Sequence, residues 1–396
     1  MDYFHFWDLP PDSYIILTEP CQKQLLLKSI DKTKTLRQLS IILREKARVY
    51  RIRAMVSFPV ITNWKTCKRR KIPVWVIIEL SRLLDISPDH IETKIIGYGN
   101  AGRSLFITGN FPIKISPEFD SVVSNFMGDG SFGNIKSLPN YKQKNELGRR
   151  IFLTKLYNVF GKFCKNDLAY DTYWQVRIPK IIGEIIKKYY QISPTDSLNR
   201  RLPNQMKNKS RNFKIAILAS FIVDEGHIGD SIEIYSGNKA LLQDYLEIAE
   251  SLEYRCTEIK KKKGHLTPRP SYRFRISARS SKKILADLEE LKQEYPNCSL
   301  AHKQKQLEQI VRKQEIQFKR CQSRKQDILK LLDHEVNTIN KLKEILPITG
   351  TTISEHLREL ENKGLIERVG KVKDADIWKR MISMAPNMQG KHSPIR

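Results

Sequence analysis

The sequence predicts an α+β protein, in which a duplicated core lies between two small helical domains. Two segments of similar pattern, Val122–Gly130 and Leu218–Gly226, each run from apolar and small residues into an acid and then a glycine. After each segment, strand-like and helical patterns follow in the same order. Short helical patterns at both ends of the chain complete the prediction. We therefore expect an internal duplication whose two acids, Asp129 and Glu225, hold equivalent positions.

The charge balance predicts a polyanionic partner. The 396 residues include 70 Lys and Arg against 43 Asp and Glu, a net charge of +27 that is spread over most of the chain. Basic globular proteins most often bind nucleic acid, and an acidic membrane surface is the competing possibility. No amphipathic anchor, lipidation motif, signal peptide or membrane span is evident, so we expect a soluble cytoplasmic protein. The six cysteines lack zinc spacing and are expected to be reduced.

The first part of the chain predicts a small helical domain at 31–92, after a mixed lead-in at 1–30. Apolar residues recur at helical spacing from Leu36 to Leu43, and candidate helices follow at Pro59–Trp64 and Val74–Leu84. Glycines then mark a turn-rich connection at 93–117.

The run Ile61–Lys65, followed by the basic Lys68–Pro73 and a closing helix, resembles the phage-repressor type of helix-turn-helix. The resemblance implies that the helix at 56–64 enters a major groove of DNA. A helical bundle with a solvated basic face is the alternative. The implied contacts are bases for Thr62 and Asn63, and phosphates for Lys65, Lys68 and Arg69.

Both copies of the core are predicted to follow the order αββαββα. The first copy, at 118–198, is expected to contain helices at 118–128, 149–160 and 181–190, with strands at 130–135 and 174–178. The second copy, at 199–294, is expected to contain helices at 212–224, 239–252 and 282–291, with strands at 227–235, 254–260 and 271–277. Alternation puts Arg177, Arg273 and Arg275 on one face and apolar residues on the other. Such a basic open face suits a saddle on a duplex.

The segments Val122–Gly130 and Leu218–Gly226 resemble the paired motifs of the LAGLIDADG homing endonucleases in their single-chain, two-repeat form. Leu218, Ala219 and Gly226 stand where that family has them, and the first motif matches best at its Gly128–Gly130 end. The resemblance implies that Asp129 and Glu225 are catalytic and, with Gly128 and Asp224, form a metal site. It also implies metal-dependent cleavage of both DNA strands.

The residue types agree with that chemistry. Small residues such as Ser124, Ala219 and Ser220 let two helices approach closely, and a glycine after each acid lets the chain turn. Two crowded carboxylates need a cation, and hard oxygen ligands favour Mg²⁺. By position alone, Lys180, Lys262 and Lys263 are candidates to assist the attacking water, although a phosphate contact or a solvated charge is the better expectation for each of them.

Three alternatives stay open. The two acids could simply terminate helices. A transcription regulator could use the same fold to bind DNA without cutting it, as some sporulation regulators that resemble this fold do. The same chemistry could also act on RNA.

The C-terminal part predicts a linker helix at 295–326, a winged helix domain at 327–384 and a disordered tail at 385–396. Ile353–Leu360, followed by Gly364-Leu365-Ile366, resembles the winged helix-turn-helix of transcription regulators. A winged helix that binds protein is the alternative. The resemblance implies base contacts from Thr351, Thr352, Ser354, His356 and Arg358, and a wing contact from Arg368.

The expected partner is therefore double-stranded DNA, with no membrane and no small-molecule substrate. We expect a monomer, because both repeats are already present in one chain.

Overall fold

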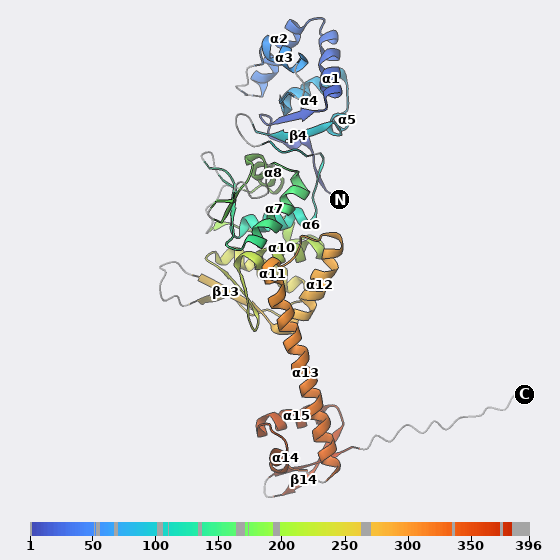
Figure 1. Cartoon of the computed structure of the whole chain (residues 1–396), viewed down its shortest axis with the longest axis vertical. Coiled ribbons are helices and arrows are strands. Elements are labelled where there is room, and N and C mark those ends of the chain that lie inside the picture. The colour runs from blue at the N-terminus through green and yellow to red at the C-terminus, as the bar shows by residue number, and fades with distance from the viewer. Residues whose placement is uncertain are drawn as a thin grey trace, which may run out of the picture. The chain divides into compact units, whose positions relative to one another are not determined.

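The computed structural model describes residues 2–50, 52, 56–66, 70–100, 106–109, 111–133, 137–163, 171–172, 174–192, 199–262, 271–334, 337–372 and 375–381. The chain divides into two compact units, Met1–Ile310 and Val311–Arg396, whose elements are labelled in Figure 1. The division falls within the linker helix predicted at 295–326. The predicted contacts Lys68, Arg69 and Lys263 and the tail at 385–396 lie outside the described residues. No described helix is both long enough and apolar enough to cross a membrane.

The first unit begins with helices that pack on a three-stranded antiparallel sheet of order β3-β2-β4. The helix predicted at Val74–Leu84 is confirmed. The helix predicted at Pro59–Trp64 is also present, and the side chain of Trp64 is buried. The predicted mixed lead-in contains a complete helix. The elements are β1 (Tyr3–Phe4), β2 (Tyr14–Leu17), α1 (Glu19–Lys32), α2 (Leu36–Val49), α3 (Phe58–Thr66), β3 (Ile72–Pro73), α4 (Val74–Leu84), α5 (Pro88–Glu92), β4 (Ile95–Gly99) and β5 (Ile113–Lys114).

Two four-stranded antiparallel sheets of corresponding order follow, β6-β7-β9-β8 and β10-β11-β13-β12. The mixed α+β character predicted from the sequence is confirmed. The first set of elements is α6 (Pro117–Met127), β6 (Gly130–Ser131), β7 (Asn140–Lys142), α7 (Glu146–Phe160), β8 (Asp171–Thr172), β9 (Gln175–Arg177) and α8 (Lys180–Tyr190). The second is α9 (Asn204–Lys207), α10 (Arg211–Glu225), β10 (Gly226–Ile228), β11 (Ile232–Ser236), α11 (Lys239–Ser251), β12 (Lys260–Lys262), β13 (Ser271–Ile276) and α12 (Ser281–Glu294).

Two strands were predicted wrongly. Of the strand predicted at 254–260, only Lys260 belongs to a strand, β12, and Cys256 forms an isolated bridge with Ile276. His227–Tyr235 is not a continuous strand, because β10 and β11 form a hairpin in which Ile228 pairs with Ile232. The amide of Gly229 donates to the carbonyl of Ser231 and closes the turn. Gly, Asp and Ser are turn residues, and here they override the β-branched alternation on either side.

Helices α6 and α10 form the centre of the first unit. Every residue of α6 is buried, and so is the stretch Ile215–Val223 of α10. Small side chains allow the close approach: the hydroxyls of Ser121 and Ser220 lie 2.5 Å apart, and that of Ser124 donates to the carbonyl of Ile217 at 2.7 Å. Since Ser121 lies beside Ser220 and Asn125 beside Asp224, the two helices run parallel and end at the same place.

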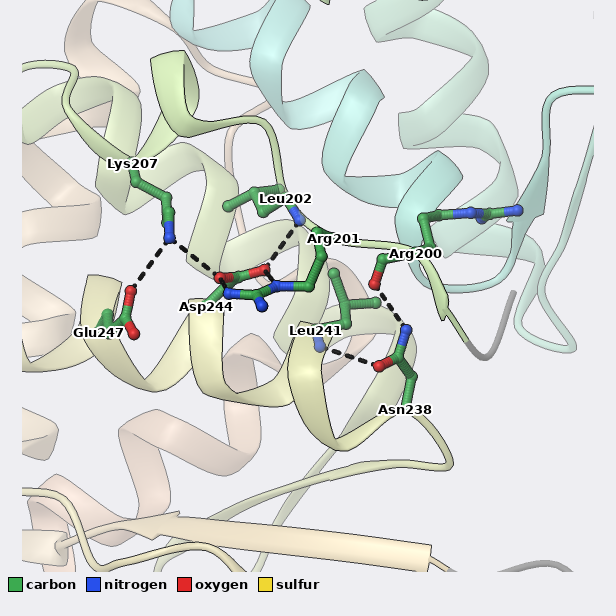
Figure 2. A network of polar contacts seen from close by, with 8 residues as sticks. All are labelled: Arg200, Arg201, Leu202, Lys207, Asn238, Leu241, Asp244 and Glu247. Carbon is green, nitrogen blue, oxygen red and sulfur yellow. Dashed lines mark hydrogen bonds and ion pairs between the residues drawn. The ribbon is translucent and has the colours of Figure 1, made fainter. Parts of the chain in front are cut away.

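The connection that leads into α10 is fastened to α11 by Asp244, as Figure 2 shows. The buried Asp244 carboxylate accepts from the Arg201 guanidinium at 2.6 and 2.8 Å and from the Leu202 amide at 2.9 Å. Lys207 bridges Asp244 and Glu247 at 3.1 and 3.2 Å. Burial alone would raise the pKa of Asp244, but these donors outweigh it and lower that pKa.

The second unit is a helix-turn-helix with a two-stranded wing. Its elements are the part of α13 (Gln304–Asp333) from Val311 onwards, α14 (Ile339–Ile345), α15 (Gly350–Asn362), β14 (Ile366–Val372) and β15 (Ala375–Arg380). Helix α15 is followed by Gly364, whose φ of 67° favours glycine and suits the end of a helix. The buried core consists of Ile328, Leu332, Leu342, Ile353, Leu357, Leu360, Ile366 and Trp378.

Candidate functional site

The acids Asp129 and Glu225 stand at the shared end of α6 and α10. Helix α6 stops at Met127, and Asp129 follows just before β6; α10 runs through Glu225 into β10. Because the two helices are parallel and in close contact, their last residues converge. The structure therefore brings together the two acids that the sequence predicted to be a pair.

The surroundings of these carboxyls disfavour their charged forms. Burial, opposed by the positive charge of Lys303, raises the pKa of Asp129 to about 6. Burial and then the negative charge of Asp129 raise the pKa of Glu225 to about 7. Since each of the two acids is half-buried and Asp129 repels Glu225, a bound divalent cation would relieve the repulsion. Paired oxygen donors of this kind suit a hard cation such as Mg²⁺.

Asp224 is held as part of the interface between the two helices. One carboxylate oxygen accepts from the hydroxyl of Tyr141 at 2.5 Å, and the other accepts from the amide of Asn125 at 2.9 Å. Enclosure by protein and the charge of Asp129 raise the pKa of Asp224 to about 8. Both of its oxygens are thus already engaged with side chains of the first copy.

Gly128 makes room for that carboxyl. A Cβ atom at Gly128 would lie 2.8 Å from Oδ2 and 2.9 Å from Cβ of Asp224. Gly128 has only its backbone to offer a metal, and its visible role is steric. Gly128 and Asp224 thus both have a packing role, and their role as metal ligands stays a prediction.

Sequence reasoning missed Lys303, which lies in the short 3₁₀ turn η4 (Ala301–Lys303) after the second copy. Its ammonium donates to the carbonyls of Ile222 at 2.9 Å and Val223 at 2.7 Å, and also to that of Gly226. Burial lowers the pKa of Lys303, and the nearby acids oppose that shift. No motif surrounds Lys303 in the sequence, so only the fold could reveal it.

Gln143 and Lys155 also contact this region and were not predicted. The amide of Gln143 donates to the carboxylate of Asp129 at 3.3 Å. The buried ammonium of Lys155 donates to Ser121 and Asn125, both at 2.7 Å, and to Ser220 at 3.3 Å. Burial lowers the pKa of Lys155. Lys155 therefore joins both helices behind the acids.

The predicted basic sheet face is partly neutralised. Arg273 and Arg275 both form ion pairs with Glu233 on the neighbouring strand β11. Arg177 is exposed on β9, and Lys180 pairs with Glu184 at 3.4 Å. Lys262 is exposed, with its ammonium 4.9 Å from the ring centre of Tyr235. Glu233 faces both arginines because β11 lies beside β13, a pairing that the sequence pattern did not indicate.

In the N-terminal helices, the predicted contacts lie on the outer side of α3. Asn63 and Lys65 are exposed, and Thr62 is half-buried. The hydroxyl of Thr62 donates to the carbonyl of Phe58 at 3.0 Å, four residues earlier in the same helix.

In the second unit, the predicted contacts divide between the two faces of α15. Thr351 and Arg358 are exposed, and Thr352 and Ser354 are half-buried. His356 is only 5% exposed, so its prediction as a base contact is wrong: it belongs to the inner face, 3.9 Å from the thiol of Cys321. On the wing, Arg368 lies over the ring of Trp378 and pairs with Glu361 at 3.4 Å and Asp376 at 3.2 Å.

Among the described residues, the one group of three or more His, Cys, Asp and Glu side chains with ligand atoms within 4.8 Å of one another is His5, Asp89 and Glu92. Glu92 accepts from the amide of Phe6 and contacts the His5 imidazole, both at 2.9 Å. These bonds tie the N-terminal segment to α5, which is a sufficient structural explanation for the group.

Comparison with known proteins identifies the C-terminal module. Residues 322–368 match the family model described as bacterial regulatory protein, arsR family. This match agrees with the predicted helix-turn-helix and implies a DNA partner. Among solved structures, the chain is similar to one described as "Structures and dynamics of mesophilic variants from the homing endonuclease I-DmoI", at 17% identity, 43% of this chain, 94% of that chain and a TM-score of 0.32. No curated protein matches the chain.

Proposed function

We propose that the protein is a site-specific DNA endonuclease of the LAGLIDADG homing type, which hydrolyses phosphodiester bonds in double-stranded DNA. One observation carries this proposal: the acids Asp129 and Glu225 leave corresponding helices at the same place, close enough that the charge of Asp129 adds to the effect of burial in raising the pKa of Glu225. Paired sheets of the same strand order accompany the two helices. In this proposal the sheets form a saddle on the duplex, and the protein acts as a monomer.

In this proposal Asp129 and Glu225 would hold Mg²⁺. When bound, the cation supplies an activated water and stabilises the leaving oxygen. Gln143 orients the Asp129 carboxylate through its amide. Lys303 fixes the end of α10 through three backbone carbonyls and so positions Glu225. Arg177 and Lys262 are exposed on the strands and would contact phosphates.

The second candidate is a DNA-binding regulator that does not cut. Two observations favour it: the match of residues 322–368 to a regulatory family, and the position of Lys303. Burial raises the pKa of both Asp129 and Glu225, and the charge of the Lys303 ammonium opposes that rise. In a centre that holds no metal, a positive charge of this kind reduces the repulsion between two neighbouring carboxylates.

A cleavage assay distinguishes the two candidates. The full chain is incubated with a randomised duplex library, first with Mg²⁺ and then with Ca²⁺, and new DNA ends are sequenced. The endonuclease predicts ends at a preferred sequence with Mg²⁺ that disappear in Asp129→Asn and Glu225→Gln. Enrichment of one bound sequence without any new ends, unchanged in both variants, would establish the regulator instead.

A further inference from the structure

A groove on the second unit lies between residues 313–324 of α13 and the helix α15. The groove has a volume of about 650 Å³. Lys313, Arg320 and Arg324 line it from α13, and Glu355 and His356 line it from α15. The three cationic side chains are exposed. The match to the regulatory family begins only at residue 322, so Lys313 and Arg320 belong to a part of α13 that precedes the matched module.

The cationic side chains form one row. Residues 313, 320 and 324 are separated by seven and four positions, which places them on one face of a helix. At 1.5 Å per residue the row is roughly 16 Å long. A DNA strand carries one phosphate per about 3.4 Å of helix axis, so the row is long enough to follow several consecutive phosphates.

The helix α15 carries little of the positive charge that binding to DNA, its expected ligand, requires. Its sequence contains the acids Glu355, Glu359 and Glu361 against the single cation Arg358. Lys325 of α13 pairs with Glu359, and the buried His356 faces Cys321. Burial first, and then the charge of Lys325, lowers the pKa of His356. The positive charge beside α15 therefore comes from α13.

We infer that this groove binds the sugar–phosphate backbone of duplex DNA, next to the major groove that α15 enters. Arg320, Arg324 and Lys313 contact phosphates, and the exposed Thr351 and Arg358 face the bases. This inference rests on the DNA-binding part of the proposed function and is independent of cleavage. An acidic protein segment is the competing occupant, and the test separates the two.

The chain offers a matched control. Arg312 and Lys319 are also exposed on α13 but do not line the groove. Arg320→Ala/Arg324→Ala and Arg312→Ala/Lys319→Ala each remove two positive charges from the same helix. The dissociation constant of the full chain for a random-sequence duplex is measured by fluorescence anisotropy over a range of salt concentrations. A plot of the logarithm of the association constant against the logarithm of the salt concentration has a negative slope. In the groove variant this slope should be shallower by about 2, since each lost phosphate contact removes about 0.9. The control variant should keep the wild-type slope.

Cys321 supplies a local readout, because its thiol lines the same groove. Its alkylation by a maleimide is followed by peptide mass spectrometry, with and without saturating duplex. Duplex should slow the alkylation of Cys321 at least fivefold in the wild type and in the control variant, and not in the groove variant.

Equal salt slopes for the two variants, or no protection of Cys321 by duplex, would overturn the inference. Protection by a poly-glutamate peptide and not by duplex would assign the groove to an acidic protein segment instead. If duplex protects Cys321 while no DNA is cut with Mg²⁺, the groove stands and only the endonuclease proposal fails.

Discussion

The ends of helices α6 and α10 occupy corresponding positions, yet they are built differently. The first copy ends in Gly128-Asp129, and the second ends in Asp224-Glu225. The carboxyl of Asp224 fills the space that Gly128 leaves open, and Asn125 and Tyr141 of the first copy hold it there. A third acid at the centre is therefore explained by packing. One acid from each copy, Asp129 and Glu225, makes up the pair that we propose as ligands of a cation.

Lys303 adds a second difference between the ends of α6 and α10. It donates to three carbonyls at the end of α10, whereas Gln143 contacts the Asp129 carboxylate. The second end is thus fixed by a cation from outside both copies. The two halves have similar backbones and unequal electrostatic surroundings, and the following predictions test that inequality.

The largest effect is expected on cleavage. Asp129→Asn and Glu225→Gln should each reduce the rate of Mg²⁺-dependent DNA cleavage at least ~100-fold, because each removes one of two charges that hold the cation. Duplex affinity measured in Ca²⁺ by anisotropy should change less than about threefold. Cleavage that persists after either substitution would show that the two acids are not both required.

Gly128→Ala tests whether the absence of a side chain at position 128 is needed to make room for the Asp224 carboxyl. A Cβ atom there meets Asp224 at 2.8 Å, and Asp224 is bonded on both oxygens, so we expect a loss of about 3 kcal/mol in the free energy of unfolding. Denaturant unfolding of the full chain measures it. Gly370→Ala is the control, because a Cβ atom at Gly370 meets no atom within 4 Å. Equal costs at the two glycines would show that Gly128 is not needed for the close approach.

Glu225→Gln should stabilise the metal-free protein at high pH. Glu225 has a pKa of about 7 in the folded protein against an ordinary 4.5, so the folded state binds the extra proton between these values. The stabilisation that this proton gives to the folded state is therefore present at pH 4 and lost as the pH rises through 7. At pH 8 in a chelator, we expect Glu225→Gln to be about 2 kcal/mol more stable than the wild type, with no gain at pH 4.

Unfolding free energies at both pH values provide the measurement, and Glu308→Gln, an exposed carboxyl on α13, is the control. A gain of the same size at pH 4 and pH 8 would mean that ionisation of Glu225 does not cause it.

The smallest effect is expected from Lys303→Met. Removing a cation beside the acids should tighten Mn²⁺ binding about fivefold at pH 8.5, because the ammonium repels the metal. Isothermal titration gives the affinity, and Lys305→Met, two residues further on and exposed, is the control. Unchanged or weaker Mn²⁺ binding would show that Lys303 acts only as a clamp on the α10 carbonyls.

The sequence was most informative where local chemistry decides the structure. The period of apolar residues located α4, Gly226 after the second acid marked where α10 stops, and α6 stops just before Gly128. Prediction failed where neighbours distant in sequence decide: Glu233 opposite Arg273 and Arg275, Cys321 against His356, and Lys303 beneath α10. These contacts depend on strand order and helix packing, which residue patterns do not specify.

The central claim is that Asp129 and Glu225 hold a divalent cation together. Calorimetric titration of the full chain with Mn²⁺ at pH 8.5 tests it most directly, using the wild type, Asp129→Asn, Glu225→Gln and the double variant. If the two acids share one cation, either single substitution removes the binding site, and the double variant shows no further loss. Binding that each single variant retains, and that the double variant retains as well, would contradict it.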